Sequence, residues 1–164
     1  MINQITSGVQ IKGLAVYHPN SVKENDYYIE HFLKQGQDIT HFLEDVLGRK
    51  SRYVIEDSKE NSLTMAIIAA KEALEKADLT GKDMDMICLA TNSAEYVVPP
   101  TAMFIHQAIG AGDEAICYDI NVNCLGMTFA MDQAMRYMQT SKRVNRVLIV
   151  TGEIGRAAAW KKRA

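Results

Sequence analysis

Apolar and polar residues follow each other along the chain in blocks that predict strands and helices in turn. Residues 86–90 read Met-Ile-Cys-Leu-Ala, and residues 147–150 read Val-Leu-Ile-Val. An unbroken apolar run of this length is typical of a strand that is covered on both faces in a parallel sheet. Two further segments have strand-like apolar content. We therefore predict four strands, over residues 9–17, 86–90, 115–122 and 144–151.

Three longer segments have the spacing of helices. In the clearest one, apolar residues recur at steps of three and four from Leu63 to Ala77, and Asn61 or Ser62 can cap its start. A second helix is predicted to follow Pro99-Pro100 and to end at Gly110. A third is predicted over residues 125–140. The three helices alternate with the four predicted strands.

Two short helices are predicted between the first strand and the clearest helix. They span residues 25–34 and 40–47, and Gly48 can end the second one. The basic run 49–53 that follows is expected to be a solvated loop. The apolar positions expected to be buried in these short helices are Phe32, Leu33, Phe42, Leu43, Val46 and Leu47.

Strands that alternate with helices predict an α/β fold with a mostly parallel sheet that helices cover on both faces. A length of 164 residues suits one domain, and we find no internal repeat and no linker-like change of composition. One domain over residues 1–164 is therefore expected. Ligands of such sheets bind at the carboxyl ends of the strands, so the junctions that follow strands are where chemistry is expected.

The composition excludes several classes of function. Eighteen Lys and Arg against 20 Asp and Glu leave a net charge of −2, which favours neither nucleic acid nor an anionic membrane as a partner. Three cysteines without a C-x-x-C pair, and four scattered histidines, encode neither a disulfide framework nor a metal site. No signal peptide and no membrane-spanning run is recognisable. We expect a soluble, cytoplasmic protein.

Cys124 is the candidate nucleophile. The chain passes from a predicted strand into a predicted helix at this residue, with almost no residues left for the turn. Backbone N–H groups and the positive end of the helix dipole favour a thiolate at such a place. The alternative is an ordinary buried cysteine, the role expected of Cys88 and Cys117 inside their strands. His18 and His106 are weaker candidates for chemistry; Asp119 is expected to pair with a neighbour.

Several segments together resemble the β-ketoacyl-acyl-carrier-protein synthase III group of the thiolase superfamily. They occur in the family's order and spacing, and the family's active cysteine stands in a C-x-G triplet that matches Cys124-Leu125-Gly126. The chain corresponds to the N-terminal half of such an enzyme, which implies a thiolase-like layered α/β half. The matching segments are residues 11–20, 47–54, 62–79, 84–100, 118–138 and 146–153.

The resemblance implies a two-step condensation. An acyl-CoA starter acylates Cys124, and malonyl-acyl carrier protein then loses carbon dioxide and attacks the acyl group. The resemblance implies an acyltransferase of fatty acid biosynthesis that acts as a homodimer, with acyl carrier protein and acyl-CoA as partners and no cofactor or metal. A histidine and an asparagine from the family's second half complete the site. No histidine follows Cys124, and Asn145 lies on the wrong side of the fold, so the chain alone is expected to be inactive in condensation.

Two regions bear on the substrate in the family. Synthases that use short acyl-CoA starters present a tryptophan and an arginine to the nucleotide, where this chain has Phe42 and Val46. Phe42 can still stack on adenine, and Arg49 and Arg52 are candidates to bind phosphate. The segment with Tyr96 and Val98 matches a loop that shapes the acyl pocket and reaches across the dimer. Met127, Met131, Ala134 and Met138 share one helix face, which is either core or the wall of an acyl channel.

Other functions stay open at this point. A 3-hydroxy-3-methylglutaryl-CoA synthase-like or thiolase-like condensing enzyme would share the cysteine turn. A cysteine hydrolase would need a histidine downstream of the nucleophile, which the chain lacks. A truncated, non-catalytic partner subunit is the alternative outside the enzymes.

Overall fold

The computed structural model describes residues 8–57 and 59–154. The chain divides into two compact units: the first joins the chain up to Tyr17 with the chain from Asn61 onward, and the second is His18–Glu60. That residues 1–164 form one thiolase-like domain stays a prediction.

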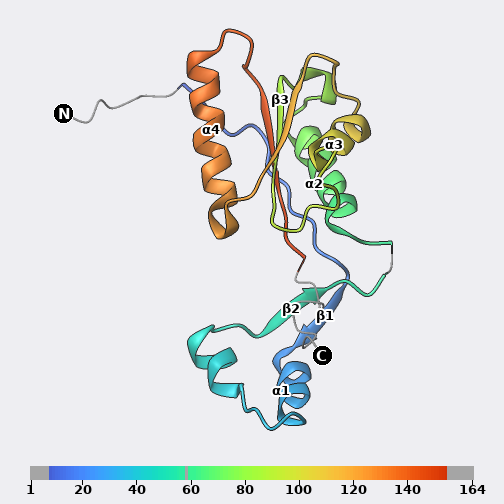
Figure 1. Ribbon diagram of the computed structural model, residues 1–164, viewed down its shortest axis with the longest axis vertical. Coiled ribbons are helices and arrows are strands. Elements are labelled where there is room, and N and C mark those ends of the chain that lie inside the picture. Colours follow the sequence, from blue (N-terminus) through green and yellow to red (C-terminus); the bar gives the residue numbers. More distant parts are fainter. Residues whose placement is uncertain (1–7, 58, 155–164) are drawn as a thin grey trace, which may run out of the picture. The chain divides into compact units, whose positions relative to one another are not determined.

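The first unit is built around a parallel sheet of three strands in the order β4-β3-β5 (Figure 1). The central strand β3, Met86–Ala90, pairs in parallel with β4, Ile116–Ile120, and with β5, Val147–Thr151. All five residues of β3 are buried. The predicted parallel sheet is confirmed, and so is the reason for the unbroken apolar run, since a central strand between two layers of helices meets no solvent.

Helices cover both faces of this sheet. Helices α2, Ser62–Lys76, and α3, Thr101–Ile109, lie on one side, and α4, Gly126–Thr140, lies on the other (Figure 1). The side chains of each strand alternate between the two layers. Those that pack toward α2 and α3 include Ile87, Leu89, Cys117, Leu148 and Val150, and those that pack toward α4 include Cys88, Ala90, Tyr118, Ile120 and Ile149.

The helix ends follow the sequence signals. The Asn61 side chain accepts a hydrogen bond from the Thr64 N–H, and the Thr64 hydroxyl accepts one from the Asn61 N–H, which completes a capping box at the start of α2. Gly110 ends α3 in the left-handed conformation, with a φ of 67°. The three predicted long helices are therefore confirmed.

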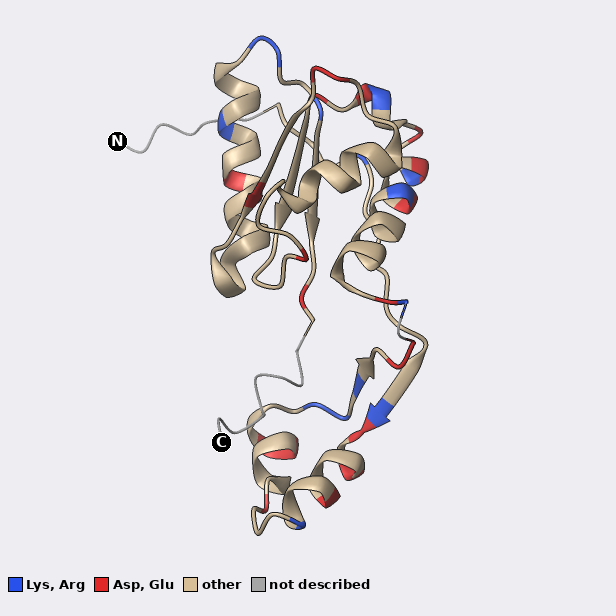
Figure 2. Ribbon diagram, turned by 45° about the vertical axis from the view of Figure 1, so that its right-hand side comes forward, with Lys and Arg blue, Asp and Glu red and all other residues tan. Residues whose placement is uncertain are grey.

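The second unit contains a two-stranded antiparallel sheet and two helical segments. Strand β1, Ser21–Glu24, pairs with β2, Ser51–Val54, and helix α1, Asn25–Leu33, follows β1 directly. A π-helical segment spans Phe42–Val46, and Gly48 with a φ of 60° follows it. Figure 2 shows acidic residues on the helical segments and basic residues on the two strands; Lys23 lies in β1 and Arg52 in β2.

Three predictions for the N-terminal third are wrong. Residues 9–17 form no strand, because neither sheet among the described residues pairs with them; Ile11, Leu14 and Val16 stay more than 60% exposed. The basic run 49–53 is no solvated loop throughout, since β2 begins at Ser51 and pairs with β1. Of the six apolar positions expected to be buried, only Leu43 is; Phe32 is half-buried and Leu33, Phe42, Val46 and Leu47 are exposed.

In the part of the chain that is described, we find no helix long and apolar enough to cross a membrane.

Candidate active site

The topology brings three junctions to one edge of the sheet. In register, Ala90 at the end of β3 lies opposite Ile120 of β4 and Thr151 of β5. The residues that follow these three strands therefore emerge side by side. The connection after β3 leads to α3 on one face, and the connection after β4 leads to α4 on the other, so the edge between β3 and β4 is the switch point at which α/β sheets bind ligands.

Cys124 lies at this switch point. It is the middle residue of a 3-10 turn, Asn123–Leu125, that joins β4 to α4, and its side chain is exposed. The preceding residue, Asn123, has a φ of 50°, a left-handed conformation that asparagine tolerates better than most residues. The sharp turn predicted from the sequence is thus present, and the alternative of a buried Cys124 does not hold.

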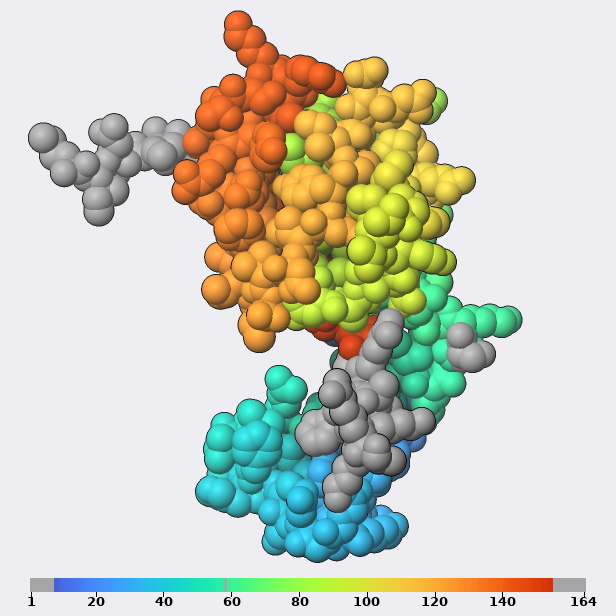
Figure 3. Space-filling model, viewed as in Figure 1, coloured from blue at the N-terminus to red at the C-terminus, as the bar shows by residue number. Residues whose placement is uncertain are grey.

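Gly126 brings the turn close to the end of β3. A Cβ atom placed on Gly126 would lie 3.2 Å from the Cβ of Ala90, closer than side-chain carbons usually pack. Helix α4 therefore starts directly against the strand that ends at Ala90. In the space-filling view, the residues around the start of α4, in light orange, and those that follow β3, in yellow-green, lie together at the surface (Figure 3).

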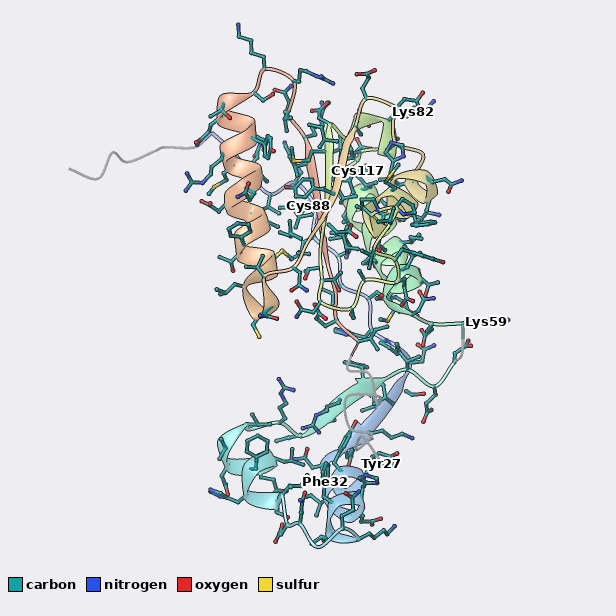
Figure 4. The ribbon with its side chains drawn as sticks, viewed as in Figure 1. Tyr27, Phe32, Lys59, Lys82, Cys88 and Cys117 are labelled. Carbon is teal, nitrogen blue, oxygen red and sulfur yellow. The ribbon has the colours of Figure 1, made fainter. Side chains whose placement is uncertain are left out.

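The other two cysteines lie within the sheet, as predicted. Cys88 is buried at the centre of β3 and Cys117 is half-buried in β4 (Figure 4). Burial raises the pKa of the Cys88 thiol, and it raises the pKa of the Cys117 thiol as well. Burial and a raised pKa disfavour the reactive thiolate at both.

A network of hydrogen bonds fixes the loop that follows β3. The Thr91 hydroxyl donates to the Gly152 carbonyl (2.7 Å), and the Asn92 N–H donates to Glu153 Oε1 (2.6 Å). On the side of β4, the Thr91 N–H donates to the Ile120 carbonyl (3.0 Å). The loop is thus tied to the ends of both neighbouring strands.

The start of α2 also forms hydrogen bonds with this loop. The hydroxyl of Ser62, a buried residue, faces two acceptors at 2.9 Å each, the Ser93 carbonyl and Glu95 Oε1. Sequence reasoning missed Ser62, Ser93 and Glu153 as members of the site. Only their positions, at the start of a helix and directly after strands, could have indicated them.

The weaker candidates for chemistry have structural partners. Asp119 accepts hydrogen bonds from the N–H groups of Thr101 and Ala102 at the start of α3, which confirms that it pairs with a neighbour. His106 Nε2 lies 2.9 Å from the Gly112 carbonyl, to which it can donate. In the second unit, the His18 ring stacks on Tyr53 with the ring centroids 4.3 Å apart.

The candidates for the acyl pocket lie on two elements of the first unit. Tyr96 and Val98 belong to the loop between β3 and α3, where the Tyr96 ring stacks on Phe104 and Val98 is 85% exposed. Met127 lies in the first turn of α4, three residues after Cys124, and is partly exposed. On the same helix Ala134 is buried in the core, whereas Met131 is exposed.

The candidates for CoA binding all lie in the second unit. Phe42 is exposed on the π-helical segment, and Arg52 places its guanidinium 4.5 Å from the centre of the Tyr28 ring. Arg49 lines a shallow pocket of about 330 Å³, which Phe42 and Arg52 do not line. Lys50 lines it as well, but these two basic side chains are outnumbered by three acidic ones, which disfavour phosphate there. The acidic residues are Glu24, Asp26 and Glu44.

Within residues 8–57 and 59–154, no group of three or more histidine, cysteine or acidic side chains is placed to hold a metal ion.

Sequence comparison links this chain to one family of enzymes. The family described as "3-Oxoacyl-[acyl-carrier-protein (ACP)] synthase III" matches residues 118–163. The β-ketoacyl-[acyl-carrier-protein] synthase III of Coxiella burnetii strain CbuK_Q154 is 28% identical over 155 residues, which are 94% of this chain and 47% of that protein. Its counterpart in Clostridium botulinum strain 657 is 29% identical over 158 residues, 96% of this chain and 46% of that protein.

Comparison of structures gives the same result. The crystal structure of 3-oxoacyl-[acyl-carrier-protein] synthase III from Aquifex aeolicus matches with a TM-score of 0.74 and 28% identity, over 89% of this chain and 45% of that one. A variant of OleA from Xanthomonas campestris matches with a TM-score of 0.77 and 25% identity, over 87% of this chain and 42% of that one. The chain spans about half the length of the curated relatives it matches. Over nearly its whole length, the chain is thus similar to about half of a β-ketoacyl-[acyl-carrier-protein] synthase III and has the corresponding fold.

Proposed function

We propose that Cys124 is the nucleophile of an acyltransferase of the 3-oxoacyl-[acyl-carrier-protein] synthase III type. The observation that carries the proposal is the position of this cysteine: it is exposed on the turn between β4 and α4, at the switch point of the sheet. The family match begins at Tyr118 and includes this turn. Cys88 and Cys117 lie within the strands instead.

The proposed reaction starts with transfer of an acyl group to Cys124. The Sγ atom attacks the carbonyl carbon of an acyl-CoA thioester, a new carbon–sulfur bond forms, and the bond to the CoA sulfur breaks. The proton that leaves the Cys124 thiol ends on CoA, so that free CoA is released. The negative charge on the carbonyl oxygen calls for an N–H donor, for which we propose the backbone of Cys124 at the start of α4.

Condensation is the second proposed step. Malonyl-acyl carrier protein loses carbon dioxide, and the resulting carbanion attacks the acyl carbon on Cys124. The bond from that carbon to Sγ breaks, the thiolate takes up a proton, and a 3-oxoacyl group remains on the carrier protein. The resemblance assigns part of this step to a histidine and an asparagine from the other half of a synthase III. We therefore expect the 164-residue chain to accept an acyl group without condensing it.

The resemblance also supports proposals on partners and setting. We propose that acyl-CoA and an acyl carrier protein are the partners of the complete enzyme, that it works as a homodimer in the cytoplasm, and that it needs no cofactor. Arg49 and Phe42 are the proposed contacts for CoA, although the acidic residues around Arg49 weaken its case as a phosphate ligand. Arg52 is a further proposed contact, and Tyr96, Val98 and Met127 are proposed to shape the acyl pocket.

Intact-protein mass spectrometry tests the first step. The chain is incubated with acetyl-CoA or octanoyl-CoA, and we expect one acyl group per chain, located on the peptide that contains Cys124. Cys124→Ala should take up none, whereas Cys117→Ala, the matched control within the preceding strand β4, should behave as the wild type. Acylation that persists in Cys124→Ala, or none in the wild type, would refute the proposal.

A further inference from the structure

Glu153 bonds to the loop after β3 rather than to a basic residue. It follows β5 by two positions, and no ion pair within residues 8–57 and 59–154 includes it. Its Oε1 accepts the Asn92 N–H at 2.6 Å, and its Oε2 accepts the Ser93 hydroxyl at 3.2 Å. A carboxylate makes stronger hydrogen bonds to such donors than a neutral acceptor does.

The bonds on either side of Glu153 run between the same two segments. The Ile154 N–H donates to Ser93 Oγ at 3.1 Å, and the Thr91 hydroxyl donates to the Gly152 carbonyl at 2.7 Å. Ser93 Oγ thus accepts from Ile154 and donates to Glu153 Oε2. Three consecutive residues after β5 thus hold three consecutive residues after β3.

The loop held in this way borders the candidate nucleophile. Strand β3 lies between β5 and β4, so the loop that follows it has Glu153 on one side and the turn with Cys124 on the other. The close approach of Gly126 to Ala90 and the bond from the Thr91 N–H to the Ile120 carbonyl link the loop to that turn. We therefore expect a substitution of Glu153 to alter the loop next to Cys124 while Cys124 itself stays unchanged.

We infer that Glu153 is a positioning residue of the acyl-transfer site: its carboxylate holds Asn92 and Ser93 so that the loop after β3 forms the wall along which the acyl thioester reaches Cys124. The inference rests on the function proposed above. A shift of about 1 Å in a group that aligns the reactants can lower a rate by about 100-fold. Glu153→Ala, which removes both acceptors, should lower the rate of acyl transfer by about tenfold or more.

The test distinguishes an effect on the position of the loop from an effect on the reactivity of the Cys124 thiol. For the full chain we would measure acylation by octanoyl-CoA, alkylation of Cys124 by iodoacetamide, and hydrogen exchange of the Asn92 amide. In Glu153→Ala, acylation should slow while alkylation by the small reagent stays within about twofold, since the thiol is exposed without help from the loop. The Asn92 amide should exchange faster. Glu153→Gln, which keeps one acceptor for the Asn92 N–H, should recover most of the rate.

Two further variants complete the design. Glu114→Ala is the matched control, because Glu114 lies at the opposite edge of the sheet, where its carboxylate bonds Arg143. It should change none of the three measurements. Ser93→Ala removes the other end of the Glu153 bond and should slow acylation in the same direction, which keeps the inference testable if Glu153→Ala fails to fold.

The outcomes are distinct. Unchanged acylation in a folded Glu153→Ala protein, or an equal fall in acylation and alkylation, overturns the positioning role and leaves the proposed function standing. If the wild-type chain alkylates at Cys124 but accepts no acyl group, the proposed function fails, and the inference fails with it.

Discussion

The carboxylate of Asp119 caps the helix that begins at Thr101. Asp119 Oδ2 accepts the Thr101 N–H at 2.6 Å, and Oδ1 accepts the Ala102 N–H at 2.8 Å. The residue before the helix is Pro100, whose side chain cannot cap it. The strand that leads to Cys124 therefore supplies the cap for a helix that precedes it in the chain, and this ties the loop between β3 and α3 to β4.

Removal of this cap should destabilise the protein. Asp119→Ala leaves two N–H groups at the start of α3 without an acceptor, and Thr101 is buried. We expect the free energy of unfolding to fall by about 1–3 kcal/mol. Asp119→Asn should cost less, because the amide oxygen still accepts one bond. Urea denaturation followed by circular dichroism measures both.

The matched control for Asp119 is Asp132→Ala. Asp132 forms an exposed pair with Arg136 one turn along α4, and such pairs contribute roughly 0.3–0.5 kcal/mol. If both alanine variants lower the stability equally, the hydrogen bonds of Asp119 to α3 do not stabilise the protein more than an exposed ion pair does.

The sheet was predictable because its pattern reports burial. Strand β3 is apolar at every position and buried at every position. Strand β1, by contrast, reads Ser-Val-Lys-Glu, and its environment includes the Lys23–Glu56 ion pair, which no apolar pattern reveals. Residues 9–17 show the opposite error. Their apolar content favours a strand, but a strand must also pair with the edge of a sheet. The local sequence does not show whether such a partner is available.

The candidate site was predictable only in part, for a similar reason. Cys124 stands at a strand-to-helix junction that periodicity alone locates. Glu153 also follows a strand, yet its bond to Asn92 joins residues 61 positions apart. Which loop a carboxylate reaches depends on the strand order β4-β3-β5, and that order is a property of the folded chain.

Gly126 should tolerate no larger side chain. The start of α4 packs against Ala90, which is 1% exposed in the central strand. Gly126→Val should lower the free energy of unfolding by about 1–3 kcal/mol through overpacking. Gly112→Val is the control, because a Cβ there meets no atom within 4 Å. Thermal unfolding compares them, and Ala90→Gly should partly rescue Gly126→Val if the contact between the two is the cause.

The left-handed backbone at Asn123 gives a third prediction. A β-branched side chain is strained at a φ of 50°, by about 1–2 kcal/mol, whereas glycine adopts this conformation freely. We expect Asn123→Val to lower the stability and Asn123→Gly to preserve or raise it. Asn145→Val serves as the control, since Asn145 is exposed and its φ is not positive. Equal melting temperatures for all three variants would argue against a left-handed residue before Cys124.

The buried thiol of Cys88 should make the stability depend on alkaline pH. Burial raises its pKa above the ordinary value of 9.0, so the unfolded chain releases this proton at a lower pH than the folded chain does. A raised pKa in the folded state contributes stability that is complete below pH about 9 and is lost as the pH rises above it. The free energy of unfolding should therefore fall as the pH rises above about 9, and urea titrations on both sides of pH 9 measure the slope. Cys88→Ala should reduce that slope.

Val150→Ala, which removes buried atoms without a titratable group, should lower the stability equally at every pH and keep the wild-type slope. An unchanged slope in Cys88→Ala would mean that the thiol does not ionise on unfolding and would contradict its burial in the sheet.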